Sequence, residues 1–246
     1  MSIARPSRPS PAGAGSAAPR VTVRLLGHFE LRIDGDEVDL PTGPQRLAAY
    51  LALRGVTPRC RVAGELWPET AQRRAMGCLR TAMWRANQAA RGLVCAVGSA
   101  LDLDRGADVD VRRTLTTSHA PDASADVLRT PPPAVDLLPT WEDDWLVHDR
   151  ERLRQLQLHR LEAGADHLRA TREFGLALEW ALAALRADPL RETAHRSVIS
   201  IHLAEGNLVE ARRMYDACVE LFRRELGVRP STMTSDLMLG ALTPSS

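Results

Sequence analysis

Apolar and polar residues alternate along residues 21–33, which predicts β-strands. The alternation has two phases, with apolar residues at 21, 23 and 25 and again at 29, 31 and 33. A period of two puts alternate side chains on opposite faces of a strand. Asp34-Gly35 follows, a dipeptide typical of hairpin turns, and residues 37–40 resume the strand pattern. We therefore expect an antiparallel β-meander over residues 21–40.

The spacing of apolar residues then changes to the helical period. The first expected helix covers residues 42–54, with Thr42 and Gln45 spaced as a capping box and Gly55 at its end. A second is expected over about residues 61–67, before Pro68, and a third over about residues 71–90. Residues 93–104 follow as a small hairpin. Strands, three helices and a hairpin in this order predict an α+β winged helix-turn-helix with an N-terminal β-sheet.

The rest of the chain has a different pattern. Residues 114–134 are polar and rich in proline, which predicts a linker, and residues 141–242 are helical in pattern. A pattern of mostly small residues recurs with a period of 34, the length of a tetratricopeptide unit. Ala177, Ala181 and Ala184 recur as Ala211, Tyr215 and Cys218. We expect three regions, namely a disordered tail (1–20), a winged-helix domain (21–115) and an all-α tetratricopeptide-like domain (116–246).

Charge is distributed unevenly along the chain. All 32 basic side chains are Arg, so the Lys of a Walker phosphate loop and Schiff-base chemistry are excluded. The net charge is only +1, but residues 42–91 hold nine Arg and two Glu, a local charge of +7. Residues 116–246 hold 15 Arg against 20 acidic residues, a charge of −5. A positive patch in a near-neutral chain indicates a polyanionic partner at that patch.

The third expected helix carries four of these nine Arg on one face. Residues 73–88 include four Arg and no acidic residue, whereas solvated helix faces usually mix both signs so that neighbouring charges pair. Arg can take both acceptors of a guanine edge, and Thr can contact a thymine methyl group. At about 100° per residue, the residues of this face, which we predict to bind DNA, are Arg73, Arg74, Gly77, Arg80, Thr81, Trp84, Arg85 and Gln88.

Further residues have narrower predicted roles. Arg46, Arg59 and Arg61 are expected to anchor DNA phosphates from the first two helices. Gly77 costs a helix about 1 kcal/mol relative to Ala, a cost that a close approach of the backbone to DNA would explain. For Trp84 the alternative to base contact is a structural role covering the junction between helix and wing.

Enzymatic chemistry has little support in the sequence. No triad, phosphate loop or metal-ligand motif stands out, and the Cys at 60, 78, 95 and 218 lack the spacing of a metal or disulfide site. We expect no catalytic residues, no metal and no cofactor. No apolar run approaches the ~20 residues of a membrane helix, and the N-terminus lacks the apolar core of a secretory signal. A cytoplasmic protein with no membrane partner is therefore expected.

Several stretches resemble a known family. "VRLLGHFELRIDG", "PQRLAAYLAL", "ELWPE" and "LRTAMWR" resemble the winged-helix half of the SARP family, antibiotic-regulatory activators of actinobacteria. "LLPTWEDDW", "ADPLRETAHR" and residues 202–231 resemble its bacterial transcriptional activation domain. The resemblance implies an OmpR-like DNA-binding fold and a homodimer on direct repeats in double-stranded promoter DNA. It also implies recruitment of the RNA polymerase holoenzyme, including its sigma factor, to a secondary-metabolite gene cluster in the bacterial nucleoid.

Two departures from the family pattern keep a second function open. The third helix ends "WRANQ" where the family usually has "WRLRR", and the expected wing has no basic tip and carries Asp102 and Asp104. The alternative is therefore an adaptor or anti-activator that has lost DNA binding and acts through protein contacts. On the first reading, a fragment of residues 21–115 is expected to bind DNA by itself.

Overall fold

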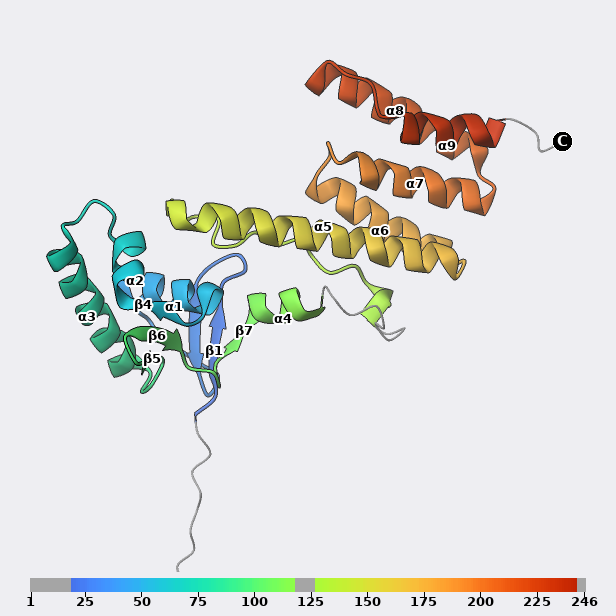
Figure 1. Ribbon diagram of the computed structural model, residues 1–246. Coiled ribbons are helices and arrows are strands. Elements are labelled where there is room, and N and C mark those ends of the chain that lie inside the picture. The colour runs from blue at the N-terminus through green and yellow to red at the C-terminus, as the bar shows by residue number, and fades with distance from the viewer. Residues whose placement is uncertain (1–18, 118–126, 243–246) are drawn as a thin grey trace, which may run out of the picture.

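The protein consists of an N-terminal half with two small sheets and a C-terminal half of stacked helices (Figure 1). The computed structural model describes residues 19–117 and 127–242. The predicted tail therefore lies almost wholly outside the described residues. The predicted order of α+β winged helix followed by all-α domain is confirmed.

The first sheet contains the predicted meander. Strands β1 (Val21–Arg24), β2 (Glu30–Ile33) and β3 (Asp36–Glu37) pair antiparallel, and the turn between β2 and β3 has Asp34 and Gly35 at φ 53° and 98°. A fourth strand, β7 (Asp108–Val109), pairs parallel with β1 and was not predicted. Asp110 then accepts hydrogen bonds from the backbone N–H of Leu25 and of Leu26, each at 3.0 Å. This carboxylate fixes the end of β1.

The three predicted helices are present as α1 (Thr42–Arg54), α2 (Arg59–Leu66) and α3 (Gln72–Ala89). The predicted capping box is wrong, because Thr42 is already helical and the N-cap is Pro41, which has no side chain able to cap. The side-chain amide of Gln45 instead donates to the carbonyl of Leu40 at 2.6 Å. Gly55 ends α1 as predicted, with φ 68°.

The predicted hairpin forms the wing of the second sheet. Strands β5 (Val94–Val97) and β6 (Ala100–Leu103) pair antiparallel through a turn at Gly98-Ser99, and β4 (Thr57–Pro58) pairs with the other edge of β6. The apolar sides of both sheets and of the three helices meet in one core, in which Leu47, Leu51 and Leu79 are almost fully buried. The predicted winged helix is therefore the observed architecture.

The linker predicted over residues 114–134 is shorter in the structure. Helix α4 (Asp110–Thr117) extends into its start, and a short 3-10 helix, η1 (Val127–Arg129), lies within it. Leu128 is buried against the C-terminal helices, and its carbonyl accepts a hydrogen bond from the indole N–H of Trp180 at 3.0 Å. Tertiary packing therefore holds part of a segment whose composition indicates only a loop.

Residues beyond the predicted boundary at 115/116 return to the N-terminal core. Leu137, Leu138, Leu146 and Leu153 belong to the same buried cluster as β1 and α1. The Leu138 N–H donates to the carbonyl of Leu25 at 3.0 Å.

Trp145 and Asp149 attach this returning segment to α1. The Trp145 ring meets Tyr50 edge-on, with 5.2 Å between ring centroids. Arg54, in the last turn of α1, pairs with Asp149 at 3.0 Å and donates to the Trp145 carbonyl at 3.1 Å. The N-terminal half is thus completed by residues 137–153, from the other side of the predicted linker.

The C-terminal half is a stack of helices: α5 (Val147–Ala170), α6 (Phe174–Ala187), α7 (Glu192–Glu205), α8 (Leu208–Leu226) and α9 (Thr232–Leu242), preceded by a 3-10 turn η2 (Asp144–Leu146). Consecutive helices pack on each other (Figure 1). Of the residues of the predicted 34-residue repeat, Tyr215 is partly buried, and the others have no exposed surface: Ala177, Ala181, Ala184, Ala211 and Cys218. None of the helices in the described ranges is long and apolar enough to cross a bilayer.

Helix α5 connects the two halves. Leu153, near its start, is in the N-terminal core, whereas Leu161, Ala165 and Leu168 are in the C-terminal core. In Figure 1 this single helix extends from above α1 to α6, and α3 lies at the opposite end of the molecule from α8 and α9. The predicted recognition face is thus far from the last repeat helices.

Candidate nucleic-acid interface

Helix α3 has the two faces that the sequence predicts. Ala75, Leu79, Ala82 and Ala86 are at most 3% exposed and pack against α1 and α2. Burial of this face holds the helix on a rigid support and leaves the opposite face in solvent. On that face Gly77 is partly exposed, and the other predicted contact residues are exposed: Arg73, Arg74, Arg80, Thr81, Trp84, Arg85 and Gln88.

The four Arg of α3 carry uncompensated charge. None of them lies in an ion pair with another residue of the two described ranges, and α3 has no acidic residue. Arg73 and Arg74 occupy the first turn, where the helix dipole already favours negative charge, so they add to the positive potential. Such a helix end is stabilised by an anion that takes the place of an acidic side chain.

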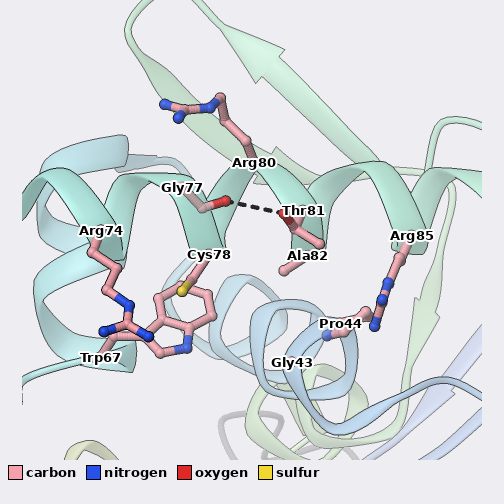
Figure 2. A pocket seen from close by; sticks show the side chains of 10 residues that line it. All are labelled: Gly43, Pro44, Trp67, Arg74, Gly77, Cys78, Arg80, Thr81, Ala82 and Arg85. Atoms are coloured by element: carbon pink, nitrogen blue, oxygen red, sulfur yellow. Dashed lines mark hydrogen bonds between the residues drawn. The ribbon is translucent and has the colours of Figure 1, made fainter. Parts of the chain in front are cut away.

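A hollow of about 610 Å³ lies beside α3 (Figure 2). Its walls come from three elements: α3, the first turn of α1, and Trp67 at the end of α2. Arg74 and Arg85 lie on one side of α3 and Arg80 projects from the other side, as Figure 2 shows. The Thr81 hydroxyl donates to the Gly77 carbonyl at 3.2 Å, so its proton is used within the helix.

Gly77 leaves room for a neighbouring side chain. A Cβ at this position would meet Nη2 of Arg80 at 3.8 Å, an ordinary van der Waals distance, and nothing else within 4 Å. The Arg80 guanidinium therefore lies over the Gly77 backbone. The internal packing of the protein does not require glycine here.

The three predicted phosphate anchors are in different surroundings. Arg46 is 22% exposed and pairs with Asp143 from the returning segment, so a phosphate would have to share or replace that partner. Arg59, at the start of α2, is partly buried, and its Nε has no hydrogen-bond partner among the described residues. Arg61 is exposed and pairs with Glu65 at 2.7 Å. The phosphate role of all three stays a prediction.

Glu65 links α2 to α1. It accepts hydrogen bonds from Arg61 Nε at 2.7 Å and from the Tyr50 hydroxyl at 2.9 Å. Burial by itself would raise the pKa of Glu65, but these hydrogen bonds outweigh burial and hold the pKa below its usual value. Burial, followed by the hydrogen bond to Glu65, raises the pKa of Tyr50 to about 12. The carboxylate is therefore charged at neutral pH and neutralises part of the positive charge of α2.

The wing has no basic residue at its tip. The turn consists of Gly98 and Ser99, both exposed. Asp102 and Asp104 lie at the other end of β6, where Asp102 is 3.6 Å from Nε of Arg105 and Asp104 accepts from the Gly106 N–H at 3.2 Å. The acidic residues are thus structural and leave the tip uncharged.

Asn87, one of the departures from the family pattern, has a role that sequence reasoning missed. Its side-chain amide donates to the Val94 carbonyl and its side-chain oxygen accepts from the Val94 N–H, both at 2.9 Å. The end of α3 is therefore fastened to the first wing strand. Only the exchange of a base for a short amide marked this position in the sequence.

The described residues offer no candidate metal site. Within residues 19–117 and 127–242, His, Cys, Asp and Glu side chains form no group of three that could hold an ion. An exposed cationic helix beside a wing is the arrangement found in winged-helix folds that bind DNA.

Comparisons with known proteins agree with this fold. Residues 132–240 match the family profile described as "Bacterial transcriptional activator domain". A solved structure of Mycobacterium tuberculosis EmbR, in complex with a low affinity phosphopeptide, matches with a TM-score of 0.67 and 18% identity over 93% of this chain and 67% of that chain. No curated protein sequence matches.

These matches establish the domain in the C-terminal half and the fold of the chain. The chain carries a bacterial transcriptional activator domain in its C-terminal half, and the likeness to EmbR shows the shared fold. The matched domain is the one that the resemblance to the SARP family implies for this half, and the shared fold supports that resemblance. The matched domain is described as one of transcriptional activators, which are not a class of enzymes.

Proposed function

We propose that this protein is a sequence-specific transcriptional activator that inserts α3 into the major groove of promoter DNA. The observation that carries the proposal is the exposed face of α3, with four Arg that lack ion-pair partners in the described structure and no acidic residue. The major groove is about 12 Å wide and admits one helix, and Arg pairs with guanine edges there. A solvated face with no DNA partner would have little reason to keep all its charges of one sign.

The C-terminal half supplies the contact with the transcription machinery in this proposal. Its charge of −5 disfavours a DNA surface, whereas stacked helical repeats present extended surfaces for proteins. The family resemblance supports RNA polymerase holoenzyme as the partner, a homodimer on direct repeats, and a secondary-metabolite gene cluster as the target. Helix α5 would hold that surface at a fixed position relative to α3.

Selection from a random-sequence duplex library, followed by binding measurements over a range of salt concentrations, tests DNA recognition. If about four to six Arg meet phosphates, the slope of log K against log salt is expected to be about −4 to −5. Arg80→Ala is expected to weaken binding to the selected duplex by about 1–3 kcal/mol and to relax the sequence preference at one base position. In vitro transcription on a selected site with purified polymerase tests activation.

An adaptor or anti-activator without DNA binding is the second candidate. It is favoured by the uncharged wing tip and by the partners already taken by Arg46 and Arg61. This candidate predicts that the library selection enriches no sequence. It also predicts that the protein still binds polymerase in a pull-down with purified components. Enrichment of a defined sequence by the wild type, but not by Arg80→Ala, would contradict it.

A further inference from the structure

The exposed side of α3 carries two separate lines of side chains. At about 100° per residue, Arg74, Thr81 and Arg85 lie within about 40° of one another, whereas Arg73, Arg80 and Trp84 lie about 80–120° further round the helix. All three Arg line the hollow, but in Figure 2 Arg74 and Arg85 extend from the side of α3 that faces α1, whereas Arg80 extends from the opposite side. The predicted recognition face is therefore not uniform.

The hollow lies in the angle between α3 and the start of α1. Pro44, Trp67, Cys78 and Ala82 give it a largely apolar floor, and Arg74 and Arg85 stand at its two ends. Neither Arg has an ion-pair partner in the structure as described, and the hollow has no acidic residue in its lining. Charge complementarity thus requires an anionic occupant that also has apolar surface.

The spacing of Arg74 and Arg85 along α3 disfavours a small anion as the full occupant. Eleven residues at 1.5 Å per residue separate the Cα atoms of Arg74 and Arg85 by about 16 Å along the helix. One phosphate or carboxylate cannot pair with both. A nucleic-acid strand can, because its charges repeat about every 3.4 Å along the axis and sugars lie between them.

The geometry of the groove decides which part of DNA reaches the hollow. A major groove about 12 Å wide is filled by one helix, whose own diameter is about 10–12 Å. When α3 occupies the groove, α1 has to stay outside it, at the edge where the sugar–phosphate backbone runs. Side chains in the angle between α3 and α1 therefore face the backbone, and those on the other line face the base edges.

We propose that the hollow seats the sugar–phosphate backbone of one DNA strand. Arg74 and Arg85 pair with two of its phosphates, and the apolar floor packs against the deoxyribose units between them. Base reading is left to Arg73, Arg80 and Trp84. The inference rests on the proposed DNA-binding function, and it assigns backbone contact and base reading to different residues of the same face.

The test uses the full chain and a duplex selected from a random library, with binding measured against salt. Arg74→Ala and Arg85→Ala are each expected to lower the salt slope by about 1, to weaken binding to selected and scrambled duplexes by the same factor, and to leave the enriched sequence unchanged. Arg85→Lys is expected to keep the wild-type slope, since Lys keeps the positive charge that Arg85→Ala removes. Arg80→Ala is the contrasting variant, for which the enriched sequence changes.

Neutral methylphosphonates placed one at a time along each strand locate the contact. A methylphosphonate at one such position is expected to weaken DNA binding by the wild type severalfold and to leave binding by the Arg85→Ala variant unchanged. At a second position it is expected to weaken binding by the wild type and to leave binding by the Arg74→Ala variant unchanged. Altered base preference in either variant, or the absence of any coupled position, would overturn the backbone seat while leaving DNA binding intact. Failure of the wild type to select any duplex would instead defeat the proposed function and this inference together. Circular dichroism melts confirm that each variant is folded.

Discussion

At the scale of the residue, Gly77 is a position where helix stability favours alanine, whereas the proposed close approach to DNA favours glycine. Nothing in the fold forbids a methyl group there, since its nearest neighbour would be Arg80 at 3.8 Å. Alanine is favoured over glycine in a helix by about 0.5–1 kcal/mol. Under the proposed function, a close approach of the α3 backbone to DNA accounts for glycine at this position.

Gly77→Ala is therefore expected to raise the free energy of unfolding by up to about 1 kcal/mol and yet to weaken DNA binding. Chemical denaturation and binding to a selected duplex measure the two effects. Gly175→Ala is the matched control, because Gly175 is exposed in α6 with open space around it. The control is expected to leave DNA affinity unchanged. Unchanged affinity in Gly77→Ala would show that the α3 backbone does not approach DNA closely at this residue.

At the scale of the element, the crossing of α5 and α6 depends on Gly164. A Cβ on Gly164 would lie 2.2 Å from Cε3 of Trp180, a distance that requires the ring or a helix to move. Trp180 is 1% exposed, and its indole N–H is bonded to Leu128, so the ring has little freedom to move. Gly164 is thus required by packing.

Gly164→Ala is expected to destabilise the protein by about 1–3 kcal/mol or more, as overpacking does. The result should appear as a lower midpoint in urea, with Gly175→Ala again as the helical Gly-to-Ala control. A midpoint equal to that of the wild type would mean that α5 and α6 can separate at no cost.

A second contact between elements, Glu162 with Arg191, makes stability depend on pH. Arg191 donates to both carboxylate oxygens of Glu162, at 2.7 and 2.9 Å, and joins α5 to the start of α7. Burial alone would raise the pKa of Glu162, but the hydrogen bonds from Arg191 and Thr193 outweigh it and lower the pKa below the ordinary 4.5. Because the folded-state pKa is lowered, the stabilisation is present above about pH 4.5 and is lost as the pH falls through the folded-state pKa.

Glu162→Gln should therefore reduce the loss of stability between about pH 5 and pH 3. The wild type should be more stable than the variant at neutral pH, and the difference should shrink in acid. Urea unfolding at a series of pH values measures this, with Glu173→Gln, at an exposed position, as the control. Parallel curves for wild type and Glu162→Gln would show that the ion pair does not contribute to the acid sensitivity.

At the scale of the whole molecule, the DNA-binding half is completed by residues from beyond the predicted linker. Leu137, Leu138, Trp145, Leu146 and Leu153 share its core. A fragment that ends at residue 115 would expose the surfaces of β1 and α1 that these side chains cover. The structure therefore changes the expectation that residues 21–115 bind DNA by themselves.

A fragment of residues 19–157 is expected to unfold cooperatively and to bind the selected duplex, whereas a fragment of residues 19–115 is expected to lack a cooperative transition. Differential scanning calorimetry and binding assays on the two fragments make the comparison. Trp145→Ala in the longer fragment is expected to lower its melting temperature, because the ring packs on Tyr50. A cooperative transition in the shorter fragment would show that the returning segment is dispensable.

The sequence by itself determined the features that repeat over short distances. The alternation of residues 21–33, the two faces of α3 and the 34-residue recurrence of small residues all follow from the fixed periods of strands and helices. The exposed Arg face was predictable for the same reason, since a helix sorts side chains by angle alone. The boundaries predicted for the three N-terminal helices came within about two residues of those observed.

Tertiary structure decided what depends on partners distant in the chain. The parallel pairing of β7 with β1, the bond from Leu25 to Asp110 85 positions away, and the pairing of Arg46 with Asp143 have no periodic signal. The same is true of the hollow beside α3, whose walls come from three elements. Periodicity assigns a residue to a face, but only the packing of that face decides whether an Arg meets solvent, a carboxylate or a cavity.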